Sequence, residues 1–304
     1  MSVSAEAAEP VLAAGAALAE GPRWDEAAGL LHWVDMSAGM WHRFDPARGP
    51  LSPRALGQRV SAIVPRTGGG HVAAVDGALL LLGERGVEQR RIAVVAPGAG
   101  VAPGAAGPPA TAADLVLNDG ACDARGRLWI GTASRAGRPD GALHRVEPDG
   151  AVHVARTGIS ISNGLGWSPD GTTLHHVDSA TGIVSAAPFH PDTGALGAPR
   201  PLIEIDRRDG IPDGLAVAAD GSIWLAIWGA GEVRRHDPDG RPRGAVTTPG
   251  AAQVTSCAIG GGRLWITTAR EGLTPAQRAD QPRAGDLFAL SLDLPGQPAH
   301  AFAG

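Results

Sequence analysis

A short unit recurs along this chain, and it consists of a turn, an apolar strand, a second turn and a second strand. The clearest copies have Trp at the centre of the first strand, as in Gly126-Arg-Leu-Trp-Ile-Gly131, Gly221-Ser-Ile-Trp-Leu-Ala226 and Gly262-Arg-Leu-Trp-Ile-Thr267. Six copies, two of them degenerate, follow one another at roughly 40 to 57 residues, which is the spacing of β-propeller blades. The turns contain Asp-Gly and Pro-Asp-Gly, which favour hairpins. We therefore predict an all-β fold, a six-bladed β-propeller formed by residues 1–304 as a single domain.

Two stretches depart from the repeat. Residues 96–113 are almost wholly Ala, Gly and Pro, and they account for the longest gap between copies. Such a segment buries too little apolar surface to offset its ordering entropy, so we interpret it as an insertion loop. We also expect residues 1–10 to be flexible.

Charge and cysteine content bound the partners. The net charge is -5 at pH 7, and the Arg residues are dispersed in a chain without Lys. This argues against nucleic acid or an anionic membrane as a partner, and it favours a small-molecule substrate. Cys122 and Cys257 have no metal-ligand spacing, so we expect two buried thiols in a reducing compartment. We see no secretory signal and no membrane span, and we expect a cytoplasmic protein, monomeric because closed propellers have few exposed edges.

Four polar turns are the candidates for chemistry, and their key residues are Glu20, Asn118, Asn163 and Asp213. Each offers a carboxylate or amide oxygen close to a Gly, and each has the same phase relative to the next strand of the repeat. That common phase predicts that all four lie at one end of the central channel. Together they would form an oxygen-only pocket with about two negative charges, which suits a divalent cation. Taken singly, each residue is more typical of an ordinary turn than of a ligand.

Other residues fit structural roles. The ten His residues invite a zinc interpretation, but several of them fall in predicted strands, where core or surface positions are the simpler reading. The Trp residues that recur in phase with the repeat predict packing. Trp228 follows the strand of the fifth copy, and we predict that it forms a wall of the substrate pocket.

The sequence resembles the senescence marker protein, regucalcin and gluconolactonase family from about residue 19 to residue 290. The segments that carry the resemblance are Glu20-Gly-Pro-Arg-Trp24, Leu117-Asn-Asp-Gly120, Ile161-Ser-Asn-Gly-Leu165, Ile211-Pro-Asp-Gly-Leu215 and Thr268-Ala-Arg-Glu-Gly272. The resemblance implies a metal site in the central channel of a six-bladed propeller, with Glu20, Asn163 and Asp213 as metal ligands. It also implies that Asn118 contacts substrate and that Asp213 is a general base.

Members of this family typically hydrolyse sugar-acid lactones with one divalent cation, and we expect Ca²⁺ here, with Zn²⁺, Mn²⁺ and Mg²⁺ as alternatives. Val116 stands where such hydrolases often carry Arg, and a family Glu that contacts substrate is missing near Arg135. An apolar side chain cannot donate to a sugar hydroxyl, so either a sugar-acid lactone or a more apolar lactone fits.

The leading hypothesis is a metal-dependent lactonase in which the cation polarises the carbonyl and Asp213 activates water. Water bound to the cation is the alternative nucleophile. Three other functions remain open: a phosphotriesterase or fluorophosphatase-like hydrolase, a non-catalytic metal-binding or ligand-binding propeller, and a biosynthetic enzyme with an adapted lactonase pocket.

Overall fold

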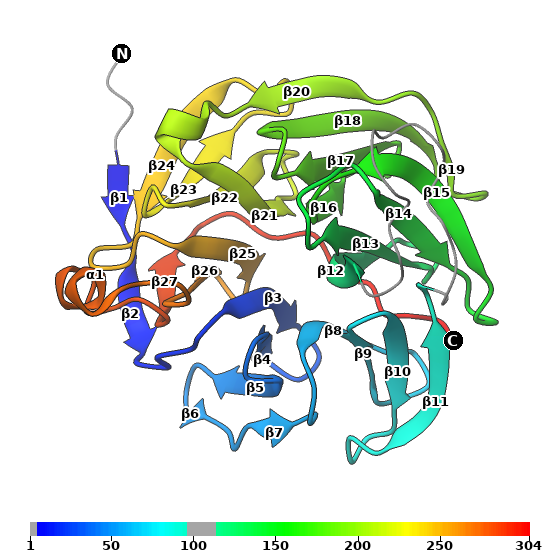
Figure 1. Cartoon of the computed structure of the whole chain (residues 1–304), viewed down its shortest axis with the longest axis horizontal. Helices are drawn as coiled ribbons and strands as arrows, with labels where there is room; N and C mark the ends of the chain where they lie inside the picture. The colour runs from blue at the N-terminus through cyan, green and yellow to red at the C-terminus, as the bar shows by residue number, and fades with distance from the viewer. Residues whose placement is uncertain (1–4, 96–113) are drawn as a thin grey trace.

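The computed structural model describes residues 5–95 and 114–304, and these form six β-sheets around a central channel (Figure 1). The predicted all-β, six-bladed propeller is therefore confirmed. The predicted insertion at residues 96–113 lies outside the described residues. In the part of the chain that the structure describes, no helix is long and apolar enough to cross a membrane.

In each blade the first strand lines the channel and later strands lie progressively nearer the rim (Figure 1). The strands are β3 (Ala19–Asp25), β4 (Leu30–Asp35), β5 (Met40–Asp45), β6 (Gly49–Pro50) and β7 (Arg54–Ala55) in blade 1; β8 (Val60–Pro65), β9 (His71–Val75), β10 (Ala78–Leu82) and β11 (Glu88–Ala93) in blade 2; β12 (Leu115–Cys122), β13 (Leu128–Ser134), β14 (Gly141–Val146) and β15 (Val152–Ile159) in blade 3; β16 (Ser162–Trp167), β17 (Thr173–Asp178), β18 (Ile183–His190), β19 (Ala195–Leu196) and β20 (Arg200–Glu204) in blade 4; β21 (Ile211–Val217), β22 (Ile223–Trp228), β23 (Glu232–His236) and β24 (Pro242–Thr247) in blade 5; and β25 (Val254–Gly260), β26 (Arg263–Thr268) and β27 (Leu287–Ser291) in blade 6. Two short helices, η2 (Arg207–Asp209) and α1 (Pro275–Asp280), lie in connections.

The N-terminal segment completes two blades. Strand β2 (Glu9–Leu12) pairs antiparallel with β27 as the outermost strand of blade 6, and β1 (Ala5–Ala7) adds to blade 5 by parallel pairing with β24. Residues 5–7 and 9–12 are therefore paired in sheets, and our expectation of flexibility over residues 1–10 stays a prediction. Edge pairing orders this segment, because β24 and β27 would otherwise expose unpaired N–H and C=O groups.

The core lies between neighbouring blades. The repeated Trp residues are buried, as predicted: Trp33, Trp129 and Trp265 are at most 1% exposed, and Trp224 is 4% exposed. Apolar side chains from adjacent sheets pack together, and burial of each large one contributes roughly 2 kcal/mol. Both predicted thiols, Cys122 and Cys257, are buried and free.

Every channel-lining strand contains a register shift at the corresponding position. The shifts lie between residues 20 and 23 in β3, 60 and 62 in β8, 117 and 120 in β12, 162 and 165 in β16, 212 and 215 in β21, and 254 and 256 in β25. A β-bulge bends its strand and redirects one side chain. The repeat therefore carries the same bulge six times around the channel.

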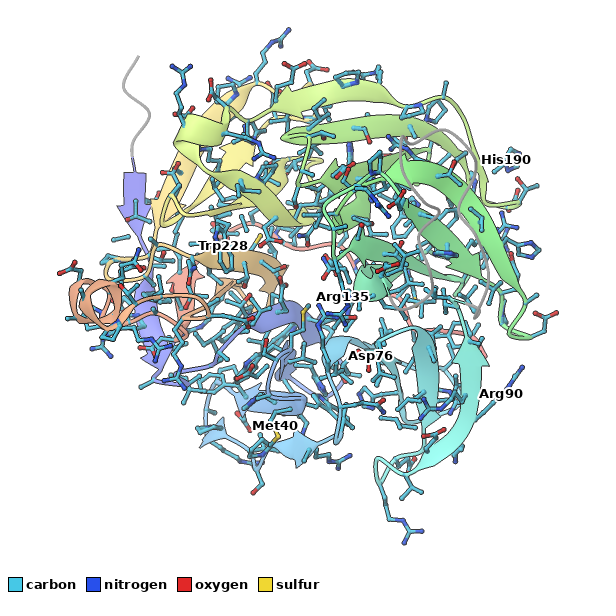
Figure 2. The ribbon with its side chains drawn as sticks, in the orientation of Figure 1. Met40, Asp76, Arg90, Arg135, His190 and Trp228 are labelled. Carbon is cyan, nitrogen blue, oxygen red and sulfur yellow. The ribbon has the colours of Figure 1, made fainter. Side chains whose placement is uncertain are left out.

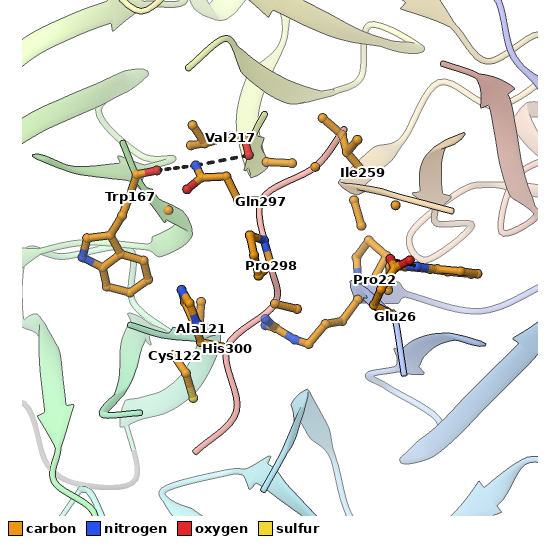
Figure 3. A pocket seen from close by; sticks show the side chains of 18 of the residues that line it. Pro22, Glu26, Ala121, Cys122, Trp167, Val217, Ile259, Gln297, Pro298 and His300 are labelled. Carbon is orange, nitrogen blue, oxygen red and sulfur yellow. Dashed lines mark hydrogen bonds between the residues drawn. The ribbon is translucent and has the colours of Figure 1, made fainter. Parts of the chain in front are cut away.

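The two ends of the channel differ. At the end where the inner strands finish, residues 292–301 cross the channel and line a cavity of about 1350 Å³ (Figure 3). The Gln297 side chain fastens this segment by donating to the Trp167 carbonyl at 2.7 Å. Further on, Phe302 is fully buried and its N–H donates to the Pro65 carbonyl. The residues of the predicted site lie toward the opposite end, near the start of the inner strands β3, β12, β16 and β21.

Candidate functional site

The bulges lie near the start of the inner strands, and polar side chains from every blade lie in or beside them. Five of these residues lie within a bulge, namely Ser61, Asn118, Asn163, Asp213 and Thr255, whereas Glu20 of blade 1 lies directly before its bulge and is still paired with Val34. The predicted common phase is therefore present, because all four candidate residues lie at the same end of the channel. The prediction of turns is wrong, since the four residues lie within β3, β12, β16 and β21.

Glycines set the spacing of the inner strands. A Cβ added to Gly164 would lie 2.3 Å from the Leu215 backbone nitrogen, and a Cβ on Gly214 would lie 2.0 Å from the Ser256 hydroxyl oxygen. These glycines therefore let β16 approach β21, and β21 approach β25. This close approach of the strands brings Asn163 next to Asp213.

Glu20 is a buried carboxyl group, 5% exposed. Its Oε2 accepts the Gly21 N–H at 3.0 Å. Burial, and next the Asp119 carboxylate, raise the pKa of Glu20 from 4.5 to about 8. A carboxylate in this position needs a cation to remain charged at neutral pH.

Asp213 is 7% exposed and lies close to Glu20. Burial raises its pKa well above the usual range, and the charges of Glu20 and Asp119 raise it further. Asn163, 6% exposed, donates from Nδ2 to the Ser179 hydroxyl at 3.1 Å. Two buried acceptors, Asn163 Oδ1 and Asp213 Oδ1, have no hydrogen-bond donor among residues 5–95 and 114–304.

Asn118 and Asp119 occupy the bulge of β12 together. The Asn118 amide, 8% exposed, donates to the Ser162 carbonyl at 2.9 Å and so joins blade 3 to blade 4. Asp119 accepts the Gly120 N–H at 2.7 Å and also lines the cavity at the far end. Burial raises the pKa of Asp119, and the Arg23 guanidinium acts against that rise. Asp119 therefore lines the cavity and also lies close enough to Glu20 and Asp213 for its charge to act on both.

The open end of the channel carries a second level of side chains. Arg59 donates to the Leu117 carbonyl at 3.0 Å and to the Met36 sulfur at 2.7 Å, which holds its guanidinium between blades 1 and 3. Figure 2 shows Arg135 beside the channel and Trp228 across from it. The role of Trp228 in binding substrate stays a prediction.

The chemistry of the three predicted ligands can be compared with what a divalent cation requires. Glu20, Asn163 and Asp213 offer only oxygen atoms, the ligand type that Ca²⁺ and Mg²⁺ prefer. The orphaned Oδ1 atoms and the two mutually repelling carboxyls are the features expected where a cation binds, so these residues fit the group. In the described part of the chain no cluster of three or more His, Cys, Asp or Glu side chains is placed to hold a metal ion.

Comparison with known proteins shows the family to which this chain belongs. Residues 18–270 match the family described as the SMP-30/Gluconolactonase/LRE-like region. The chain belongs to this family.

Relatives of this SMP-30/gluconolactonase chain are similar over nearly its whole length. A 6-deoxy-6-sulfogluconolactonase of Pseudomonas putida is 32% identical over 292 residues, covering 94% of this chain and 95% of that protein. Regucalcin of Gallus gallus is 30% identical over 297 residues, covering 94% and 95%. A crystal structure of a calcium-binding protein, regucalcin, from Agrobacterium tumefaciens has a TM-score of 0.90 with 28% identity, and all of each chain is covered.

Membership in the SMP-30/gluconolactonase family confirms the resemblance that the motifs predicted. Sequence reasoning still missed two residues at the site, Asp119 and Arg59. Asp119 lies inside the Asn118-Asp119-Gly120 motif, so the sequence did contain a signal for it. Two consecutive polar residues before Gly are compatible with a β-bulge, which can turn both side chains inward. Arg59 precedes β8 in a degenerate copy of the repeat, where no sequence signal marked it.

Proposed function

We propose that this protein is a divalent-cation-dependent lactone hydrolase. Glu20, Asn163 and Asp213 would hold the cation, for which Ca²⁺ is the first choice. The observation that carries the proposal is the pair of buried, mutually repelling carboxyls beside two acceptor atoms that no donor among the described residues reaches. A bound cation would supply Lewis-acid polarisation of the lactone carbonyl and stabilisation of the oxyanion.

The chain's own residues account for the remaining chemistry. Asp213 Oδ1 has no donor in the described structure, so it can accept a proton from the water that attacks the carbonyl carbon. The ring C–O bond then breaks, and the leaving alkoxide takes up a proton to give a hydroxy acid. Asn118, fixed by its bond to Ser162, would contact and orient the lactone.

The names of relatives support a lactone substrate. A Pseudomonas putida relative is a 6-deoxy-6-sulfogluconolactonase, which is named for a sugar lactone. The Agrobacterium tumefaciens structure is named a calcium-binding protein, and this favours a non-catalytic cation-binding propeller as the second candidate.

Hydrolysis after chelation and reloading tests the proposal. The protein would be treated with EDTA, reloaded with Ca²⁺, Mn²⁺, Mg²⁺ or Zn²⁺, and assayed on sugar lactones, alkyl lactones and paraoxon. We expect turnover of at least one lactone only after reloading. Asp213→Ala should abolish that turnover while its circular dichroism spectrum remains that of the wild type. The control is Asp239→Ala, whose side chain is 73% exposed on the same blade.

Each outcome separates the candidates. Cation binding without turnover of any ester would indicate a non-catalytic cation-binding propeller. Turnover of paraoxon alone would indicate a phosphotriesterase. Wild-type activity in Asp213→Ala would remove this residue from the mechanism.

A further inference from the structure

We propose that Arg59 and Arg135 form an anion-recognition pair at the open end of the channel, so that the substrate is a lactone bearing an acidic substituent. The substituent would be a carboxylate or a sulfonate on the part of the substrate farthest from the carbonyl. This inference rests on the proposed function, and it names the substrate class of the same site.

The position of Arg59 is the first argument. Its guanidinium is half-buried and is fixed at two points, the Leu117 carbonyl and the Met36 sulfur. Glu20 lies close enough to act on the charge of Arg59. A planar donor group held next to the predicted cation site can bind a substrate anion with little loss of side-chain entropy.

Arg135 provides the second cation from another blade. It lies in the hairpin between β13 and β14, and its backbone N–H donates to the Asp114 carbonyl at 2.9 Å. Figure 2 shows its side chain beside the channel. Arg135 is exposed, so its guanidinium is accessible to a ligand.

The two cations are near enough to repel each other. Burial lowers the pKa of Arg59, and the charge of Arg135 is the next largest cause of that lowering. The arginine ion pairs found among the described residues are made by other arginines. An acidic group bound between them would relieve this repulsion and gain charge-assisted hydrogen bonds.

Neighbouring acids limit the site to a small anion. Asp76 and Glu271 also act on Arg59, and Glu271 accepts a hydrogen bond from the Ser37 hydroxyl. These two charges offset much of the positive potential, so a single acidic group fits better than a polyanion. Val116, which stands where related hydrolases often carry Arg, is 7% exposed, and its side chain has no donor. Recognition of the far end of the substrate therefore falls to the arginines.

Matched lactones test the inference in the Ca²⁺-loaded protein. D-Glucono-lactone and D-glucaro-lactone differ at carbon 6, which carries CH₂OH in the first and a carboxylate in the second. We expect the wild type to prefer the acidic lactone about tenfold or more in kcat/KM. Arg59→Gln and Arg135→Gln should each lower that preference about tenfold, and Arg59→Lys should restore part of it because the charge remains. Arg48→Gln is the matched control, since its side chain is 89% exposed on an outer hairpin.

A binding measurement separates this inference from the proposed function. Calorimetry with the products, glucarate and gluconate, should show tighter glucarate binding that both Gln variants weaken. If no lactone is hydrolysed but glucarate binding depends on the arginines, the hydrolase proposal fails and the anion site stands. If neutral lactones are hydrolysed and the preference is absent, or is the same in all variants, the anion-recognition pair is refuted while the hydrolase stands.

Discussion

Replacing Glu20 by Gln should have opposite effects on stability with and without a cation. Burial and the neighbouring Asp119 charge raise the pKa of Glu20 to about 8, whereas its ordinary value is 4.5. In cation-free protein between these two pH values, the folded state holds a proton that the unfolded state has lost. The folded state binds more protons, so the free energy of unfolding falls as pH rises from about 5 to about 8.

The magnitude follows from the size of the shift. Each pKa unit corresponds to about 1.4 kcal/mol, so a rise from 4.5 to about 8 costs the cation-free protein about 4 kcal/mol at pH 8. Gln cannot ionise and retains an oxygen that can accept the Gly21 N–H. We therefore expect Glu20→Gln in EDTA to be roughly 2 to 4 kcal/mol more stable than wild type at pH 8, and about equal to it at pH 5. The lower figure allows for sharing of a proton with Asp213.

Urea unfolding followed by circular dichroism would measure this at pH 5, 6.5 and 8, in EDTA and in millimolar CaCl₂. Calcium should raise wild-type stability at pH 8 by mass action and should do little for Glu20→Gln, which has lost one ligand charge. The control is Glu84→Gln, an exposed carboxylate on blade 2. A flat pH dependence of the wild type in EDTA, or a Glu20→Gln protein that is less stable at pH 8, would refute the reasoning.

Three further predictions concern the scaffold. Asp123 is 2% exposed and accepts hydrogen bonds from the buried Arg127 guanidinium at 2.7 Å and from the Trp129 indole N–H at 2.8 Å. Asp123→Asn should therefore lower the free energy of unfolding by about 3 kcal/mol in urea titrations, whereas the exposed Asp239→Asn should leave it unchanged. Gly214→Ala should fail to accumulate as folded protein, because its Cβ would meet the Ser256 side chain at 2.0 Å; a soluble, cooperatively unfolding variant would contradict this. Burial raises the pKa of both Cys122 and Cys257 to about 12, so iodoacetamide at pH 8 should modify neither thiol until denaturant is added, as mass spectrometry would show.

The sequence predicted the fold well because the repeat combines two independent signals. Turn residues mark where strands end, and Trp residues recur at positions that must be buried between blades. Both signals are local, and a propeller needs little more, since each blade packs mainly on its neighbours. The strands at residues 5–7 and 9–12 escaped prediction for the same reason. Their Ala-rich and Glu-rich sequence carries no strand pattern, and they form only because the edges of β24 and β27 are available.

The sequence predicted which residues lie together at one end of the channel. It did not predict the backbone conformation that places them there. Glu20, Asn118, Asn163 and Asp213 looked like turn residues because Gly and Pro accompany them. A β-bulge uses the same residues, and its register is decided by the partner strand, which single-sequence reasoning does not see. Arg59 was missed because its importance comes from Arg135, a residue on the next blade.

The same β-bulge occurs in the inner strand of all six blades. The side chain at the bulge can therefore differ from blade to blade without disturbing the fold. At the bulge position the hydroxyls of blades 2 and 6 are used by the scaffold: Ser61 donates to the Ala74 carbonyl, and Thr255 donates to the Ala19 carbonyl. Blades 4 and 5 instead carry Asn163 and Asp213, each with a buried oxygen that no described donor reaches. The repeat therefore supplies the placement, and variation at the bulge position supplies two of the three proposed ligands, Asn163 and Asp213. It follows that exchanging Thr255 should damage folding, whereas exchanging Asn163 for a residue of similar size should damage cation binding first.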